Sequence, residues 1–451
     1  MRPHRREWLR MVLAGTVAAE AASSKRAGAE GPQGSPLLIT GLKVTPIAVP
    51  DPPILAASGC HGPYFLRNVV ELRAEGGIVG IGETHGGSDI TRALERAGQV
   101  LTGQNAFGYR KFGRPLQVMS VAAHAAIEMA CIDACARATG RRFCELVGGP
   151  VRDWVEFAAY LFFRYAADHP VVLSDPRLVD SRGRGDRALD SWGEVRTPEA
   201  MAAMAARFRD RWGFRVFKLK GGVLSPDLEY QTMKDLAAQL GPKALLRIDP
   251  NGRWREDTAV RIGKKLGQVP LEYYEDPVNG QSAMAAVRRE TGLKMSTNMC
   301  VTRFEDIPEA LKLKPIDVLL CDHHYFGGFA GCQALGPICR AAGWSLSQHS
   351  NNHTGVTMAA MIHLAASIPE LTLASDTHYP WLIESSDIIE GPKLSIKDGR
   401  MAVPPGPGLG VTLDQDKLAR AGETYVKCGM RGREDGVLMR RLEPGWNGGL
   451  L

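Results

Sequence analysis

The sequence predicts an α/β fold in which a parallel β/α barrel follows an α+β domain. Two observations carry this prediction. Strand and helix patterns alternate from about residue 152 to residue 400, and six consecutive predicted strands end in a base, a carboxylate or an amide. Before residue 152 the order differs, because strand patterns come first and helical patterns follow.

Composition favours a globular protein and excludes some classes of partner and site. The chain has 451 residues, of which 44% are hydrophobic and 23% charged, enough for a large core in roughly two or three domains. The formal net charge of +6 is modest, and no basic stripe interleaves with aromatic residues, so we expect no nucleic-acid partner. The nine cysteines are scattered without a Cys-x-x-Cys pair, which argues against a disulfide framework and a zinc site.

Residues 1–35 are predicted to form a disordered leader outside the fold. Arg5 and Arg6 precede a weakly apolar run from Met11 to Ala19, a pattern that resembles a twin-arginine export signal. The run is too short to span a bilayer, so we expect no membrane insertion. We therefore expect a periplasmic or exported protein, and a cytoplasmic protein with a basic leader is the alternative.

The first folded unit spans residues 36–151. An antiparallel meander is followed by helices, of which the second ends at Gly140 in a C-cap position. The expected strands are 38–49, 68–73 and 78–83, and the expected helices are 91–102 and 120–139.

The barrel spans residues 152–400. Ser225-Pro226 and Thr197-Pro198 are typical helix starts, and glycines such as Gly213 and Gly343 stand where helices should end. The expected strands are 155–161, 214–220, 245–249, 271–276, 294–298, 316–322, 344–349 and 371–374.

Catalytic side chains of such barrels stand at the carboxyl ends of the strands. Lys218 and Lys220 lie two residues apart on one face of the second strand, and an exposed strand with two solvated lysines is the alternative. Like charges so close should lower each other's pKa, which would let a lysine act as a general base. A single Asp or Asn at a strand end is more often a turn former, but six polar ends in succession are hard to explain that way. The other ends carry Asp249, Asn251, Glu275, Asn298, Asp322 and His349.

These residue types sort by chemistry. Asp249, Glu275 and Asn298 offer hard oxygen ligands on three adjacent strands, a set that suits Mg²⁺. Lys220 and His349 flank that set, and Asp322 could hold the other nitrogen of the imidazole. A base on each side of a metal-bound carboxylate is the arrangement that abstraction of an α-proton needs.

The motifs Lys-x-Lys, Asp-Pro-Asn-Gly, Glu-Asp-Pro, Thr-Asn, Asp and His resemble the enolase superfamily, in its mandelate-racemase-like group. Residues 217–224, 296–299 and 349–353 resemble glucarate dehydratases, and the similarity covers about residues 38 to 445. The resemblance implies a modified TIM-type (β/α)7β barrel, an N-terminal α+β capping domain, and a segment at 401–451 that returns to the capping domain.

The resemblance also implies roles. Lys220 would be one base, with Lys218 as the neighbour that tunes it, and Asn251 would stabilise the intermediate. His349, paired with Asp322, would be the second base and the acid that expels the β-hydroxyl. The Mg²⁺ ligands would again be Asp249, Glu275 and Asn298.

Substrate contacts follow only from the resemblance. Without it, His61 would be read as a surface loop residue, Arg433 as a solvated charge, and the aromatic pair on the first strand as ordinary core. The substrate-binding residues implied are His61, Tyr160, Phe162, Ser350 and Arg433. The chain departs from the family at Ala56, where an asparagine is expected, and in shorter segments before Ser120 and after Pro277.

We therefore predict Mg²⁺-dependent dehydration of a sugar diacid, D-glucarate or L-idarate, to a keto-deoxy acid by a homo-oligomeric enzyme. Dehydration of another aldarate or an aldonate, and epimerisation of an acid sugar, are alternatives within the family. A barrel that binds sugar acids without turnover is the alternative from another class, and opposed bases argue against it.

Overall fold

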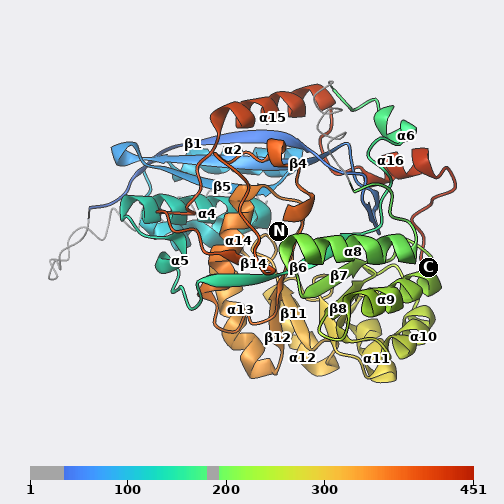
Figure 1. Cartoon of the computed structure of the whole chain (residues 1–451). Coiled ribbons are helices and arrows are strands. Elements are labelled where there is room, and N and C mark those ends of the chain that lie inside the picture. Colours follow the sequence, from blue (N-terminus) through green and yellow to red (C-terminus); the bar gives the residue numbers. More distant parts are fainter. Residues whose placement is uncertain (1–34, 180–191) are drawn as a thin grey trace, which may run out of the picture.

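The computed structural model describes residues 35–179 and 192–451, which form two packed units (Figure 1). The first unit is an antiparallel sheet in the order β1-β4-β5 with helices on it. Its register pairs Val70 with Val44 and with Gly82, which turns alternate side chains toward helix α4. Its main elements are β1 (Ile39–Pro50), β4 (Tyr64–Ala74), β5 (Val79–His85), α2 (Ser88–Leu101), η2 (Ala106–Phe112), α3 (Gly113–Met119), α4 (Val121–Ala138) and α5 (Phe143–Leu146).

The second unit is a nearly closed barrel of eight parallel strands in the order β12-β11-β10-β9-β8-β7-β6-β13, which confirms the predicted fold class. A parallel bridge between Leu346 and Leu371 brings β12 beside the chain that leads into β13. The strands are β6 (Trp154–Phe162), β7 (Val216–Lys220), β8 (Leu245–Asp249), β9 (Leu271–Glu275), β10 (Met295–Thr297), β11 (Val318–Cys321), β12 (Ser345–Gln348) and β13 (Ser375–Thr377).

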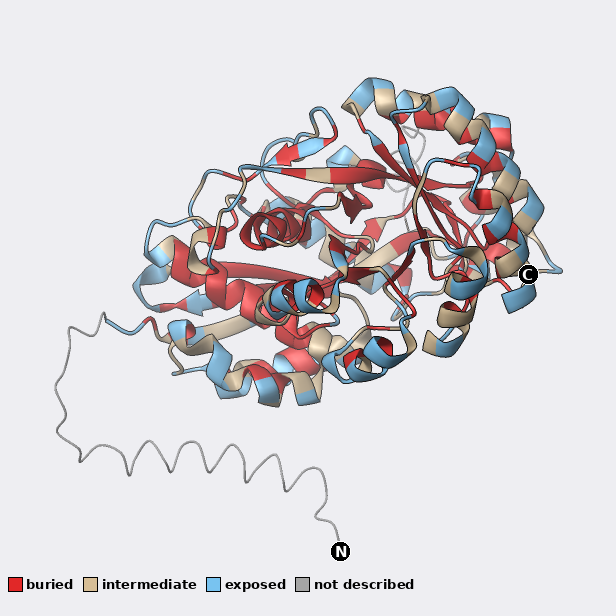
Figure 2. Cartoon of the chain, turned by 90° about the horizontal axis from the view of Figure 1, so that it is seen from below, coloured by how far each residue is buried: buried red, intermediate tan, exposed pale blue. Residues whose placement is uncertain are grey.

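Helices cover the outside of the barrel. In Figure 2 the strands are buried, whereas the helices around them are exposed on their outer sides. Ser225 caps α9 by accepting from the N–H of Leu228, and Gly213 ends α8 at a φ of 70°, which a residue with a side chain rarely adopts. The helices are α8 (Pro198–Trp212), α9 (Pro226–Leu240), α10 (Glu256–Leu266), α11 (Gln281–Thr291), α12 (Ile307–Leu313), α13 (Gly328–Ala342) and α14 (Gly355–Ser367).

The eighth strand is not where the sequence places it. Residues 371–374 were expected, but β13 begins at Ser375, where pairing with Phe157 of β6 starts. The apolar residues Leu371 and Leu373 resemble a strand, yet the polar run Ser375-Asp376-Thr377 makes the ladder and lies buried inside the barrel. Hydrophobicity marked the wrong stretch because this strand end faces a polar interior.

The first unit, called the capping unit from here on, contacts the barrel through buried carboxylates that lie at the N-termini of barrel helices. Glu128 on α4 accepts from the N–H of Phe329 at the start of α13, at 2.5 Å. Glu83 on β5 accepts from the N–H of Thr354, at 3.1 Å, and of Thr357, at 2.8 Å, at the start of α14. These first-turn N–H groups have no partner within their helices, so a carboxylate stabilises each helix end.

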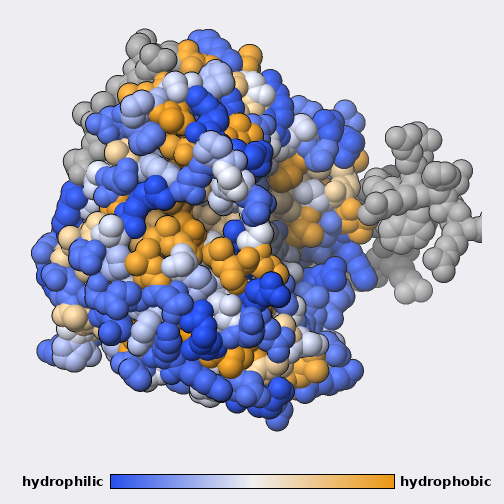
Figure 3. Space-filling view, turned by 90° about the vertical axis from the view of Figure 1, so that its right-hand side faces the viewer, coloured by the Kyte–Doolittle hydropathy of each residue, from blue (hydrophilic) through white to orange (hydrophobic). Residues whose placement is uncertain are grey.

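The C-terminal segment runs back to the first unit. β14 (Arg400–Ala402) pairs antiparallel with β6, α15 (Gln415–Cys428) packs on β1, and α16 (Asp435–Leu442) packs on β3 (Gly59–Cys60). Figure 1 shows α15 lying across the outer face of the three-stranded sheet. The face in Figure 3 is mostly hydrophilic, with hydrophobic residues gathered in separate patches.

The prediction of a periplasmic or exported protein is wrong. The leader with Arg5 and Arg6 lies outside the described residues, and nothing in residues 35–179 and 192–451 indicates export. The described helices also include none with the length and hydrophobicity of a membrane span. The signal was weak because a basic pair before a short, weakly apolar run also suits an ordinary leader.

Candidate active site

The two lysines at the end of β7 meet carboxylates from neighbouring strands. The Nζ of Lys218 donates to Glu275 Oε1 at 2.6 Å and to Asp376 Oδ2 at 2.7 Å. The Nζ of Lys220 donates to Asp249 Oδ2 at 2.7 Å and contacts the hydroxyl of Tyr160 at 3.1 Å. The barrel therefore brings the predicted base beside the predicted metal ligands.

The expectation that the lysines lower each other's pKa is wrong for this arrangement. Burial opposes the charged form of Lys220, but the charge of Asp249, followed by Tyr160, outweighs it and raises the pKa above its usual value. For Lys218, Asp376 and Glu275 likewise outweigh burial and raise the pKa strongly. Opposite charges at hydrogen-bond distance dominate over the second lysine.

Two of the predicted metal ligands, Asp249 and Glu275, are buried, and one of their four carboxylate oxygens lacks a donor. Asp249 Oδ1 accepts from Asn251 N at 3.0 Å and from Asn251 Nδ2 at 3.2 Å, while the buried Glu275 Oε2 has no hydrogen-bond partner among the described residues. Burial, followed by the charge of Asp249, raises the pKa of Asp276 to about 7. A shortage of donors around buried carboxylates is what a bound cation relieves.

The carboxamide of Asn298 adds to this argument. Its oxygen faces only acceptors; the reversed amide would donate to Asp276 Oδ2 at 3.1 Å and to Glu275 Oε1 at 3.2 Å. An oxygen pointed at carboxylate oxygens is the orientation that a cation between them favours. Asn251 and Asp276 also have positive φ angles, 55° and 34°, a strained conformation that clusters at functional sites. The residues present fit Mg²⁺.

His349 and Asp322 form a hydrogen-bonded pair just beyond β12 and β11. His349 Nδ1 lies 2.9 Å from Asp322 Oδ2. Burial alone would raise the pKa of Asp322, but His324 and His349 outweigh it and hold the pKa well below its usual value. The ionised carboxylate therefore accepts from Nδ1–H and leaves Nε2 of His349 available as a base.

The substrate-binding residues expected from the family also come together. His61, only 2% exposed, has its Nδ1 3.2 Å from Asp51 Oδ2, so it is not the surface loop residue of the alternative reading. Arg433 contacts both His61 and Asp435, which joins the C-terminal segment to the loop of the first unit that carries His61.

The aromatic pair lies near the lysines. The rings of Tyr160 and Phe162 are 4.7 Å apart, and Lys220 contacts the Tyr160 hydroxyl. Ser350, next to His349, donates to the carbonyl of Asn351 at 3.0 Å.

Two residues at this site are not among those predicted from the sequence. Asp376 on β13 accepts from Lys218 at 2.7 Å, and the buried ring of His378 lies 4.7 Å from Tyr160 and 5.2 Å from Phe162. Both follow residues 371–374, the segment that the sequence predicts as the eighth strand. The polar run from residue 375 to 378 was the signal that could have found them, because it repeats the pattern of the other strand ends.

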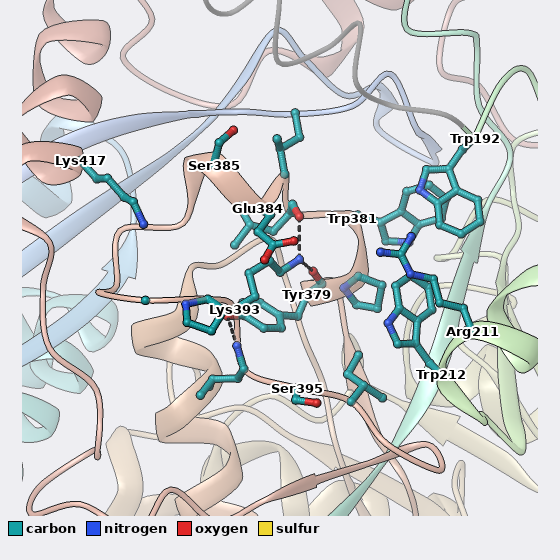
Figure 4. Close-up of a pocket in the computed structure, with 17 residues that line it drawn as sticks. Trp192, Arg211, Trp212, Tyr379, Trp381, Glu384, Ser385, Lys393, Ser395 and Lys417 are labelled. Carbon is teal, nitrogen blue, oxygen red and sulfur yellow. Dashed lines mark hydrogen bonds between the residues drawn. The ribbon is translucent and has the colours of Figure 1, made fainter.

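A larger cavity, about 940 Å³, lies away from these groups, between the end of α8 and residues 379–396 (Figure 4). Lys393 in its wall donates to the carbonyls of Tyr379, at 2.5 Å, and Leu382, at 2.6 Å, so it cross-links the surrounding chain. A smaller cavity, about 100 Å³, includes Asp51, Arg67 and Arg433. We place the candidate site beside the smaller cavity because a pocket that shares Arg67, Asn351 and Asn352 with it is lined by Asp322, His349 and Ser350.

Comparison with known proteins shows the family to which this chain is similar. A family model described as "Enolase C-terminal domain-like" matches residues 200–417. A "Probable glucarate dehydratase" of Streptomyces coelicolor is 38% identical over 437 residues, covering 91% of this chain and 97% of that protein. A chloromuconate cycloisomerase of Pseudomonas putida is 26% identical over 367 residues, covering 78% of this chain and 90% of the relative.

Solved structures match over nearly the whole chain. An enolase from Mycobacterium smegmatis complexed with tartrate has a TM-score of 0.85 and 38% identity, covering 93% of this chain and 99% of that one. An enolase from Pseudomonas fluorescens with bound magnesium, potassium and tartrate has a TM-score of 0.85 and 36% identity, covering 92% and 99%.

Proposed function

We propose that this chain, which belongs to the enolase superfamily, is a Mg²⁺-dependent hydro-lyase that removes water from a sugar diacid. The prediction of an enzyme similar to a glucarate dehydratase is confirmed by the comparisons. D-glucarate and L-idarate are the substrates that we propose. The tartrate in two similar structures, itself a hydroxy diacid, supports a diacid substrate.

The observation that carries the proposal is the placement of two bases on opposite sides of the carboxylate group. Lys220 ends β7 and the Asp322–His349 pair follows β11 and β12, while the predicted ligands end β8 and β9 and follow β10 between them. A substrate carboxylate bound at the ligands would therefore present its α-carbon between the two bases. Neither a binding protein nor a simple hydrolase needs this arrangement.

His349 would be the base that starts the reaction of D-glucarate. Its Nε2 takes the α-proton, and the electron pair of that C–H bond forms a carbon–carbon double bond. The β-hydroxyl leaves with the C–O electron pair and takes a proton from His349, which releases water. The enol that remains tautomerises to the keto-deoxy acid. Lys220 would take the α-proton of L-idarate, which differs at the carbon that reacts, from the opposite face.

Asp249, Glu275 and Asn298 would hold the metal. Bound there, Mg²⁺ would stabilise growing negative charge on the substrate carboxylate and would offset the charge of Asp249 that raises the pKa of Lys220. Arg433 and His61 would bind the distal carboxylate, since a guanidinium binds a carboxylate through two hydrogen bonds. The expected homo-oligomer stays a prediction.

Incubation of the purified protein with D-glucarate and Mg²⁺, followed by NMR, tests the proposal. We expect signals of a keto-deoxy acid, their loss with a chelator, and no turnover by His349→Asn. A panel of other sugar diacids and monoacids defines the substrate. If no acid in the panel gives a keto acid with Mg²⁺, the proposed function is wrong.

A further inference from the structure

Asp322 holds two histidines rather than one. Its Oδ2 lies 2.9 Å from His349 Nδ1, and its Oδ1 lies 2.8 Å from His324 Nδ1. The backbone N–H of His324 donates to the same Oδ1, also at 2.8 Å. The proposed chemistry uses His349 and Asp322 but assigns nothing to His324, although that side chain is buried beside them.

The tautomer of His324 follows from its two partners. Its Nε2 lies 3.5 Å from the Nη2 of Arg67, a guanidinium nitrogen that can only donate. Nε2 therefore accepts, and Nδ1 carries the proton that is donated to Asp322. Both carboxylate oxygens are thus engaged by N–H donors, and the carboxylate cannot rotate without losing one of them.

Arg67 belongs to the capping unit and is itself fixed. Its Nε donates to Glu83 at 2.7 Å and its Nη2 to the Thr357 hydroxyl at 3.3 Å. A continuous row of buried contacts therefore runs from β4 through His324 and Asp322 to His349. Hydrogen bonds between buried groups are electrostatically stronger than in water, so this row should hold its geometry.

Apart from Asp322, the charged group next to His324 is the guanidinium of Arg67. The rings of His85 and His323 lie 4.4 Å and 3.9 Å from the His324 ring, and burial lowers the pKa of both well below the usual value, so they stay neutral. Ligand atoms of Asp322, His323 and His324 lie within 4.8 Å of one another, as a metal site would require. The adjacent guanidinium of Arg67 disfavours a cation there.

We propose that His324 is a positioning residue for His349: it fixes the Asp322 carboxylate and, through Arg67, ties the orientation of this base to the capping unit. The proposal rests on the proposed function. It predicts that loss of His324 impairs the reaction of His349 but not that of Lys220. Lys220 on β7 has its own partners, Asp249 and Tyr160, and shares no hydrogen bond with Asp322 among the described residues.

The test compares two reactions in each variant. His324→Phe keeps an aromatic ring but has no donor, and His324→Gln keeps a polar group near Arg67 without a donor at the Nδ1 position. His324→Asn retains an N–H near the Nδ1 position and should rescue. We expect the first two to lower kcat for D-glucarate about tenfold to a hundredfold with little change in KM, by analogy with the outer-shell partners that orient metal-ligating histidines.

The second reaction is exchange of the α-proton of L-idarate with solvent deuterium, which Lys220 would perform. It should stay at the wild-type rate in every His324 variant. His323→Phe is the matched control, since it is equally buried and adjacent but makes no hydrogen bond to Asp322 in the described structure. Equal loss of both reactions in the Phe and Gln variants, or loss of neither, would overturn the proposal.

A third measurement separates this proposal from the proposed function. Nitrogen-15 NMR of labelled histidines reports the tautomer of His349 without turnover. We expect the Nδ1–H form in the wild type and in His324→Asn, and a mixture of tautomers in His324→Phe and His324→Gln. If the wild type acts on neither acid, the proposed function fails, and an unchanged His349 tautomer in both variants still refutes the positioning role.

Discussion

Replacement of Glu83 by glutamine should destabilise the protein at neutral pH but much less in acid. Glu83 is fully buried on β5 and accepts from Arg67 Nε at 2.7 Å and from the Thr354 hydroxyl at 2.8 Å. It also accepts from the N–H of Thr357 at the start of α14, at 2.8 Å. A glutamine keeps one acceptor oxygen and turns an NH₂ toward groups that are themselves donors.

The size of the expected loss of stability follows from the shift in the pKa of Glu83. Burial alone would raise the pKa of Glu83, but Arg67, His353 and the hydrogen bonds from Thr357 and Thr354 outweigh it and lower the pKa from 4.5 to about 2. A shift of about 2.5 units corresponds to about 3 kcal/mol, at about 1.4 kcal/mol per unit. Because the folded pKa lies below the unfolded one, this stabilisation is present above pH 4.5 and is lost as the pH falls toward 2.

Urea unfolding of the wild type and Glu83→Gln across a pH series measures this contribution. We expect a difference of about 3 kcal/mol near pH 7 that shrinks by about 2 kcal/mol near pH 3. Glu309→Gln, at an exposed position on α12, serves as the control and should show almost no difference at any pH. A difference for Glu83→Gln that stays constant with pH would refute the electrostatic reasoning.

Three further predictions concern the candidate site. Glu275→Gln should lose most activity with its circular dichroism unchanged, and calorimetry should show weaker Mg²⁺ binding; unchanged affinity would contradict the ligand assignment. His349→Asn should abolish D-glucarate dehydration but keep α-proton exchange of L-idarate, and Lys220→Met should do the reverse, with losses of about a hundredfold or more by NMR in deuterium oxide. Asp376→Asn should lower kcat about tenfold or more, because Lys218 loses one of its two close carboxylate partners; a normal kcat would make Asp376 a purely structural residue.

The strand ends could be predicted because their signal is local. Asp249 and Glu275 are the last residues of their strands, and Asn298 and His349 follow theirs directly, as strand length and turn residues predict. The rule that parallel strands of a barrel expose their carboxyl ends at one face then places these side chains together. No knowledge of distant contacts is needed for either step.

The direction in which the pKa values of the two lysines shift could not be predicted in the same way. Lys218 and Lys220 are neighbours in sequence, which suggested lowered pKa values, but Glu275 and Asp376 face Lys218 across the barrel and raise its pKa. Asp376 itself was missed because the eighth strand was placed by hydrophobicity, whereas the residues that pair with β6 are polar.

The sequence by itself determined the barrel, the order of its strands and the residue types at their ends, because hydrophobic periodicity and turn chemistry act over a few residues. Only the tertiary structure decided which partner each side chain meets. Arg433 contacts His61 from 372 positions away, and Arg67 reaches His324 from 257. Such pairs follow from the packing of the capping unit and the C-terminal segment on the barrel, which depends on the whole core and leaves no local pattern in the chain.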